Sequence, residues 1–270
     1  MIVNSKELLI EAKKKKKCIF QFNINNLEWT RFILEECEYL EEPVILGISE
    51  STVEYMGGYK TISNLIKNLC IYLNITIPVV IHLDHGKTFD SCKKAIDNGF
   101  TSVMIDASKY DIDENINITK KVCDYAHKKN VTVECEMGYI KTEEEDVELT
   151  KVADAIRLIK ETNADALAPS VGNAHGIYRN KANLDYNRIS QISHEVNIPL
   201  VLHGGSGLSN EQIKQAIDCG ICKLNINTEL QQAWVSGVRK YLFENDEYDP
   251  RKIIKSGESN IKKVIENKFK

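Results

Sequence analysis

Residues 78–105 read PVVIHLDHGKTFDSCKKAIDNGFTSVMI, and this stretch decides the fold class. Two apolar, β-branched runs, at 78–83 and 101–105, lie on either side of a segment with the apolar spacing of a helix. Near-continuous apolar runs are typical of strands buried on both faces, and a helix between two of them is typical of a parallel sheet. The stretch therefore predicts a strand–helix–strand unit.

The same alternation extends along the whole chain. Eight segments have the pattern of buried strands: residues 18–22, 43–48, 78–83, 101–105, 131–134, 164–169, 198–202 and 221–226. Helical patterns lie between them, and several end in Gly or Asn. Eight such units in about 250 residues predict an α/β fold, a (β/α)8 TIM barrel that forms one domain over residues 1–270. A doubly wound open sheet is the alternative, but it normally has a glycine-rich turn after its first strand, and QFNINN at 21–26 has no glycine.

Composition and charge narrow the classes of function. The 270 residues are 43% hydrophobic and 27% charged, as in ordinary soluble proteins. A formal net charge of −4 is not typical of a nucleic-acid-binding protein. No apolar run approaches the roughly 18 residues of a membrane-spanning helix, and the N-terminus lacks the apolar core of a signal peptide. We therefore expect a cytoplasmic protein that binds neither nucleic acid nor a membrane.

Polar side chains gather where the predicted strands end, which is where TIM barrels carry their chemistry. They are Ser49, Asp84, His85, Asp106, Glu134, Glu136, His175, His203, Asn225 and Asn227. Histidines at three different strand ends, beside carboxylates, indicate a catalytic metal site with an open position. Strand alternation places His82 and Asp84 on one face and His85 on the other unless the strand ends at residue 84. Either histidine of this strand could therefore be the ligand.

The segment HGGSG, residues 203–207, follows a predicted strand and precedes a predicted helix. Small residues allow backbone N–H groups to approach an anion closely at a helix N-terminus. This loop therefore indicates a phosphate site.

A series of segments in order along the chain resembles the class II, metal-dependent fructose-bisphosphate aldolase family. The segments are FNINNLE, PVILGISE, YMGGYKT, IHLDHGKTFDSCKKAIDNGFTSVMIDAS, VECEMG, LAPSVGNAHGIY, LVLHGGSGL, KLNINTE and YDPRK. The resemblance implies that a catalytic Zn²⁺ is held by His85, His175 and His203, with Glu136 and Asp106 within reach of the metal. It also implies that Asp84 takes the C4 hydroxyl proton of the substrate and that Glu144 exchanges a proton at C3.

The resemblance further implies a set of substrate-binding residues: Asn23, Ser49, Gly176, Gly204, Ser206, Asn225, Asn227 and Arg251. Of these, Gly176, Gly204 and Ser206 would bind one phosphate and help to hold a monovalent cation, Na⁺ or K⁺. Arg251 would bind the distal phosphate, in its own site or in that of a neighbouring subunit. From the residues alone, a surface arginine is the preferred interpretation. By the same resemblance we expect a homodimer or a homotetramer.

Two segments depart from the usual pattern of the family, one at Lys141 and Thr142 and the other at Asn227. Lys141 and Thr142 stand where two glycines are usual, and the segment after Glu143 is shorter, which predicts a stiffer loop. Asn227 stands where fructose-bisphosphate enzymes often carry Asp and tagatose-bisphosphate enzymes carry Ala. The leading hypothesis is reversible cleavage of fructose 1,6-bisphosphate to dihydroxyacetone phosphate and glyceraldehyde 3-phosphate, a step of glycolysis. The alternatives are an aldolase for tagatose 1,6-bisphosphate or another keto-sugar phosphate, and a metal- and sugar-phosphate-binding barrel with little turnover.

Overall fold

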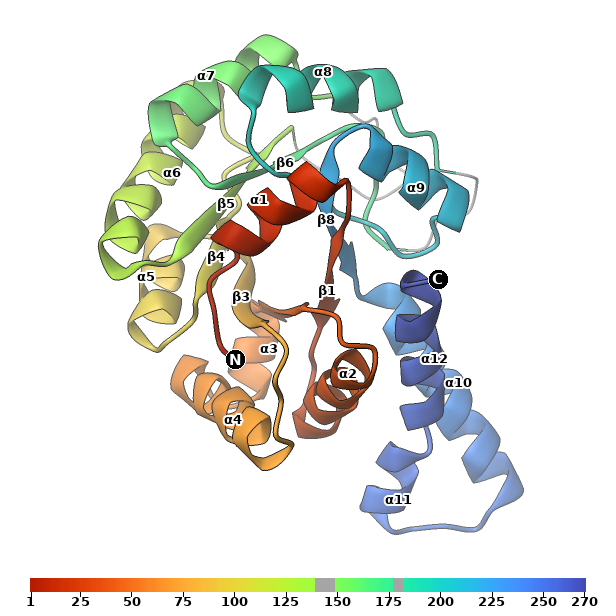
Figure 1. The fold of residues 1–270 in the computed structure, drawn as a ribbon. Helices are drawn as coiled ribbons and strands as arrows, with labels where there is room; N and C mark the ends of the chain where they lie inside the picture. The colour runs from red at the N-terminus through yellow and green to blue at the C-terminus, as the bar shows by residue number, and fades with distance from the viewer. Residues whose placement is uncertain (139–148, 177–181) are drawn as a thin grey trace.

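Eight parallel strands close into a barrel in sequence order, and β8 completes it by pairing with β1 (Figure 1). The computed structural model describes residues 1–138, 149–176 and 182–270. Within these residues the strands are β1 (Ile19–Asn23), β2 (Val44–Ser49), β3 (Val79–Gly86), β4 (Ser102–Ile105), β5 (Thr132–Met137), β6 (Ala166–Pro169), β7 (Leu200–Leu202) and β8 (Ile221–Ile226). This is the (β/α)8 TIM barrel that the sequence predicts, and closure of the sheet excludes the open alternative.

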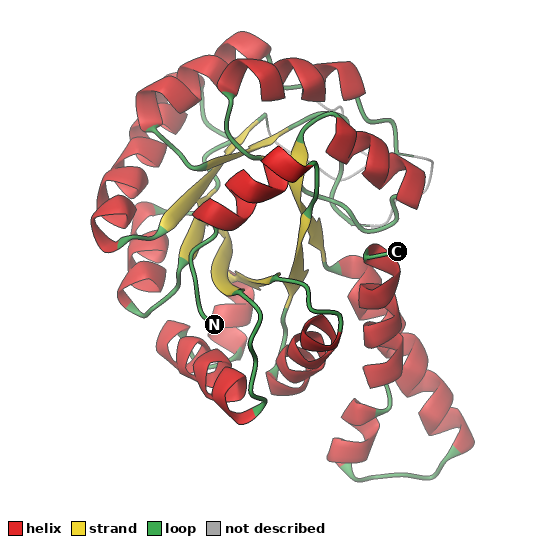
Figure 2. Cartoon of the chain, in the orientation of Figure 1, coloured by secondary structure: helices red, strands yellow, loops and turns green. Residues whose placement is uncertain are grey.

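Helices surround the strands, as Figure 2 shows. They are α1 (Lys6–Lys15), α2 (Leu27–Tyr39), α3 (Glu50–Tyr55), α4 (Tyr59–Tyr72), α5 (Phe89–Asp97), α6 (Ile112–Ala126), the short 3-10 helix η1 (His127–Lys129), α7 (Val152–Thr162), α8 (Tyr186–Val196), α9 (Asn210–Asp218), α10 (Thr228–Glu244), α11 (Pro250–Lys255) and α12 (Glu258–Lys268). Among the described residues, no helix has the length and apolar character needed to cross a membrane.

Side-chain caps fix the start of helices that follow the strand ends. Thr88 precedes α5: its hydroxyl accepts the backbone N–H of Ser91, and the Ser91 hydroxyl accepts the N–H of Thr88. Ser209 and Gln212 form the same arrangement at the start of α9. Each pair satisfies N–H groups that the first helical turn leaves without an intrahelical partner. Because α9 begins shortly after HGGSG, this loop lies beside a helix N-terminus, as the sequence predicts.

The side chains that point into the barrel change from apolar to polar along the strands. At the amino end they form an apolar cluster with α1, which includes Leu9, Ala12, Ile19, Ile45, Val80 and Val201. Helix α1 crosses this end of the barrel in the view of Figure 1. Alternate positions further along the same strands are polar: Gln21 and Asn23 in β1, and His82 and Asp84 in β3. The inward-facing polar side chains of these strands therefore lie toward the carboxyl end.

Helices α10, α11 and α12 form an arm beside the barrel. α10 packs on α12, α12 packs on α2, and α11 lies at the end of the arm away from the barrel (Figure 1). Phe243 and Tyr248, near that end, are 92% and 91% exposed. The arm therefore presents aromatic side chains that the barrel does not cover.

Candidate active site

A β-bulge near the end of β3 decides which histidine joins the metal-competent cluster. The register between β3 and β4 shifts between Leu83 and Gly86, and His85 has a φ of 51°, in the left-handed region that side chains rarely adopt. A bulge breaks the two-residue alternation of a strand and redirects the side chain at that position. His85 therefore joins the other strand-end histidines, whereas His82 stays inside the barrel below them.

Three histidines from three segments converge at the carboxyl end of the barrel. The ring centres of His85, His175 and His203 lie 4.7 to 5.7 Å apart, and one ligand atom of each lies within 4.8 Å of the other two. The Nε2 atom of His85 faces the Nδ1 atom of His203 at 3.0 Å. Three convergent imidazoles are the donor set of a catalytic metal site that keeps one position open. The residues present therefore fit a bound metal ion.

Carboxylates lie against the same histidine. His85 Nδ1 is 3.0 Å from Asp106 Oδ2 and 3.9 Å from Glu136 Oε2, and the three residues form a second metal-competent group. Ser108, which the sequence did not reveal as a site residue, has its hydroxyl within 2.9 Å of both carboxylates. Burial lowers the pKa of His85, but the Asp106 hydrogen bond and the charges of Asp84 and Glu136 outweigh it and raise this pKa to about 9.

Asp84 is a buried carboxylate held by two amides. Its Oδ2 accepts a hydrogen bond of 2.8 Å from Asn23, and its Oδ1 faces the amide nitrogen of Asn225 at 3.4 Å. Burial raises the pKa of Asp84, but its electrostatic interactions with His85, His203 and Lys223 outweigh burial and hold the pKa well below its usual range. The carboxylate is therefore ionised and oriented, as a general base must be.

A buried ion pair lies directly beneath the histidines. Glu134 Oε1 is 2.9 Å from His203 Nε2, and Glu134 Oε2 is 2.6 Å from Lys223 Nζ. Lys223 Nζ also lies 3.4 Å from His82 Nε2, and His82 Nδ1 is 2.8 Å from the hydroxyl of Ser102. The sequence placed Glu134 at a strand end without a role, and Lys223 was missed. The sequence offers one signal for Lys223: it is a charged residue in a mainly apolar strand, two positions before Asn225, so that both side chains lie on the same face.

The predicted substrate-binding residues at the ends of β2 and β8, and just after β7 and β8, border this cluster. Ser49 is the register partner of Asp84, and its hydroxyl caps α3. The buried Ser206 hydroxyl accepts the backbone N–H groups of Asn227 and of the residue two positions later, both at 3.3 Å. Within the described part of the chain, the buried Oδ1 atoms of Asn225 and Asn227 have no hydrogen-bond partner. They are acceptors available to a hydroxyl group or a cation.

Glycine is required at two positions of these loops. Gly176 and Gly204 have φ values of 96° and 69°, in the region that favours glycine. In the adjacent loop residue Gly205, an added Cβ would lie 2.7 Å from the Leu224 side chain and 2.9 Å from the Asn225 carbonyl oxygen. The backbone of the 203–207 loop is therefore packed closely on β8.

Arg251 is a predicted site residue that is not part of this cluster. Arg251 lies in α11, its side chain is 88% exposed, and it pairs with Asp249 at 2.8 Å. Glu144 lies outside the described residues, as do Lys141 and Thr142.

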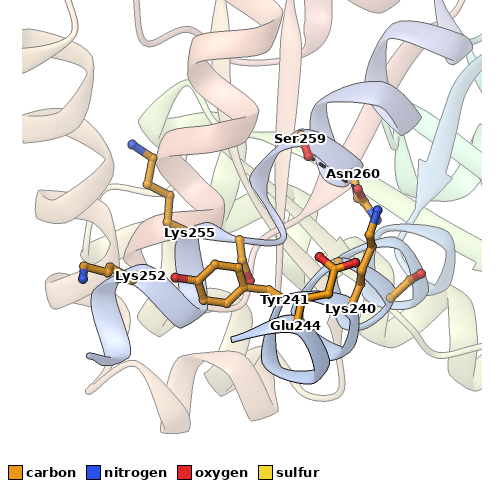
Figure 3. A pocket seen from close by; sticks show the side chains of 10 residues that line it. Lys240, Tyr241, Glu244, Lys252, Lys255, Ser259 and Asn260 are labelled. Carbon is orange, nitrogen blue, oxygen red and sulfur yellow. Dashed lines mark hydrogen bonds between the residues drawn. The ribbon is translucent and has the colours of Figure 1, made fainter. Parts of the chain in front are cut away.

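A separate cavity of about 500 Å³ lies between α10, α11 and α12 (Figure 3). Its lining includes Lys240, Tyr241, Glu244 and Lys252 but no histidine. Among the residues that the structure describes, the groups of histidines and carboxylates that could bind a metal lie at the barrel mouth instead.

Solved structures share this fold. The YdjI aldolase from Escherichia coli K12 has a TM-score of 0.89 at 30% identity, covering 100% of this chain and 96% of that chain. A fructose-bisphosphate aldolase from Campylobacter jejuni has a TM-score of 0.84 at 23% identity, covering 99% and 94%. At the latter identity the likeness shows the fold alone.

Similar sequences extend the likeness to the whole chain. A fructose-bisphosphate aldolase from Geobacillus stearothermophilus is 48% identical over 275 residues, and one from Staphylococcus aureus strain Mu50 is 46% identical over 279 residues. Both alignments cover 100% of this chain and 96% of the relative. The family model described as class-II fructose-bisphosphate aldolase matches residues 3–270. The chain therefore belongs to the class-II fructose-bisphosphate aldolase family.

Proposed function

We propose that this protein reversibly cleaves fructose 1,6-bisphosphate to dihydroxyacetone phosphate and glyceraldehyde 3-phosphate, a reaction of glycolysis, in the cytoplasm. We propose further that residues 1–270 act as one aldolase domain. The observation that carries the proposal is the convergence of three histidines beside the ionised, amide-held carboxylate of Asp84. The full-length likeness to proteins named fructose-bisphosphate aldolase supports the choice of substrate.

His85, His175 and His203 would hold the metal ion, for which Zn²⁺ is our proposal because three imidazoles with an open position suit it. Asp106 and Glu136 would be further ligands, since both lie close to His85. A bound ion of this kind would supply Lewis acidity, which would polarise the ketose carbonyl so that the C1–C3 fragment can accept the electron pair of the breaking C3–C4 bond.

Asp84 would be the base of the cleavage step. Asp84 would take the proton of the C4 hydroxyl, and C4 would become the aldehyde carbon. The C3–C4 bond would break, and the electron pair of that bond would stay with the C1–C3 fragment. The amides of Asn23 and Asn225 hold the carboxylate in place for this transfer. Glu144 would return a proton to C3.

The substrate phosphate would bind at Gly176, Gly204 and Ser206, together with a monovalent cation, Na⁺ or K⁺. The positive φ of both glycines and the nearby start of α9 support this assignment, because backbone N–H groups there can face an anion. The Oδ1 atoms of Asn225 and Asn227, which have no hydrogen-bond partner among the described residues, would accept from substrate hydroxyls or bind the cation. Asn23 and Ser49 would complete the triose site.

Arg251 would bind the distal phosphate of the substrate in the active site of a neighbouring subunit, within a homodimer or homotetramer. Its place in an arm that extends from the barrel, near the exposed Phe243 and Tyr248, supports contact with another subunit rather than with its own site.

A coupled assay of triose phosphate release tests the proposal. It is run with fructose 1,6-bisphosphate and tagatose 1,6-bisphosphate, before and after EDTA treatment and after Zn²⁺ is restored. We expect preferred cleavage of the fructose compound, abolished by EDTA and recovered with Zn²⁺. Preference for tagatose 1,6-bisphosphate would contradict the proposal that fructose 1,6-bisphosphate is the substrate that binds next to Asn227. Absence of turnover of either sugar by folded, zinc-loaded protein would favour a binding protein.

A further inference from the structure

Lys223 is a lysine buried inside the barrel. Its side chain is 1% exposed, and its ammonium lies between Glu134 and His82. Lysine is rarely buried to this extent unless it is paired. A buried ion pair is a weak source of stability, because the desolvation of both charges offsets most of their attraction, and apolar residues of similar size often replace such pairs without loss. The packing of the barrel therefore does not by itself explain this lysine.

The donors around Glu134 determine the state of the neighbouring histidines. An ammonium group only donates hydrogen bonds, so Glu134 Oε2 and His82 Nε2 both act as acceptors toward Lys223. Glu134 Oε1 accepts in turn from Nε2–H of His203. The lone pair of His203 then lies on Nδ1, which faces His85 Nε2 at 3.0 Å, at the centre of the three-histidine cluster. One chain of contacts thus runs from Lys223 to a metal-facing nitrogen.

We propose that Lys223 is a positioning residue for metal binding, which compensates the charge of Glu134 so that Glu134 holds His203 with Nδ1 toward the metal. A carboxylate that accepts the second ring N–H of a ligand histidine fixes its tautomer and orientation, and loss of such a group typically weakens metal binding by about 10- to 100-fold. This inference rests on the proposed function, because it takes His203 as a metal ligand.

The test measures the Zn²⁺ affinity of the full-length protein by competition with a chelator, after EDTA treatment and removal of EDTA. We expect Lys223→Met to bind Zn²⁺ about tenfold more weakly or worse. We also expect Lys223→Gln, which retains a donor to Glu134 but no charge, to bind at least about threefold more weakly. The double variant Glu134→Gln/Lys223→Met should recover to within about threefold of wild type, because a neutral amide oxygen can still accept from His203 without a buried charge.

Lys268→Met is the matched control. Lys268 has a side-chain exposure of 5% and pairs with Glu229 at 2.7 Å, in the arm rather than beneath the histidines. The Lys268→Met substitution also takes a buried lysine partner away from a carboxylate, in this case Glu229. The Zn²⁺ affinity of this variant should stay at the wild-type value. The visible spectrum of the Co²⁺-substituted protein is a second readout: it should change in Lys223→Met and not in Lys268→Met.

Each outcome decides for or against the inference. Wild-type Zn²⁺ affinity in Lys223→Met or in Lys223→Gln would overturn it. Failure of the double variant to recover would assign Lys223 to packing alone, and so would overturn it as well. If Lys223→Met does not fold, as judged by circular dichroism, Lys223→Gln and the double variant decide. Absence of Zn²⁺ binding by the wild-type protein would instead refute the proposed metal site itself.

Discussion

Acidification should destabilise this protein through His82. The side chain of His82 is buried inside the barrel, where Nδ1 is 2.8 Å from the Ser102 hydroxyl and Nε2 faces the ammonium of Lys223 at 3.4 Å. Burial, and then the charge of Lys223, lower the pKa of His82 from 6.5 to about 3. The ring is therefore neutral in the folded chain at a pH at which the unfolded chain would protonate it.

The sign and size of the effect follow from proton linkage. Stability from the neutral ring is fully present above pH 6.5, is lost as the pH falls below that value, and stops changing below about pH 3, where both states bind the proton. One proton difference is worth about 1.4 kcal/mol per pH unit. Between about pH 7.5 and pH 5, His82 should therefore remove about 2 kcal/mol from the free energy of unfolding.

The assay is urea unfolding followed by circular dichroism, with wild type and His82→Asn compared across this pH range. EDTA is present throughout, because metal binding is itself pH-dependent. Asparagine does not titrate, and its amide can donate to Ser102, but it loses the contact with Lys223. We expect the variant to be less stable at neutral pH and its deficit relative to wild type to shrink by about 2 kcal/mol at pH 5. Parallel stability curves for the two proteins would refute the reasoning.

Three further changes test other parts of the site. Asp84→Asn should lower kcat by about 10²- to 10⁴-fold while the bound Zn²⁺ content stays constant, and near-normal turnover would remove Asp84 as the base. Arg251→Ala should raise KM for fructose 1,6-bisphosphate by about tenfold or more with little change in Tm, since the side chain is exposed; an unchanged KM would make it a surface arginine. Gly205→Ala should lower stability by about 1–3 kcal/mol, because the new methyl group would meet Leu224 and the Asn225 carbonyl; an unchanged Tm would show that the loop can shift freely.

The order and number of the strands could be predicted from apolar runs, but two strand ends could not. β3 continues to Gly86 and β5 to Met137, three residues beyond the predicted limits of 83 and 134. The prediction ended each strand where the apolar run ended. In a barrel, however, the inward-facing positions near the carboxyl end carry the polar site while the backbone ladder continues. Polar residues at these positions therefore mark the site rather than the end of the strand.

Two features of the site lay outside what pattern reasoning can supply. The two-residue alternation of a strand could not show whether His82 or His85 joins the cluster. That alternation assumes a regular strand, whereas β3 contains a bulge with a left-handed residue, His85. Lys223 and Glu134 are 89 positions apart in sequence, so their pairing exists only once β5 and β8 face one another across the barrel. A lysine within an apolar strand is a signal in itself, since its charge needs a buried partner.

The charges at the barrel mouth support the proposed metal site. In the lower layer, Glu134 is paired with Lys223, so that layer is compensated by the protein alone. In the upper layer, Asp84 and Asp106 form no salt bridge with lysine or arginine among the described residues, and both interact electrostatically with His85 instead. Without metal, the proton on His85 compensates part of this charge, which is why its pKa rises to about 9. A divalent cation would replace that proton and supply one charge more. Under the proposed function, the fixed ion pair would hold His203 in place while the exchangeable charge above it would serve the reaction.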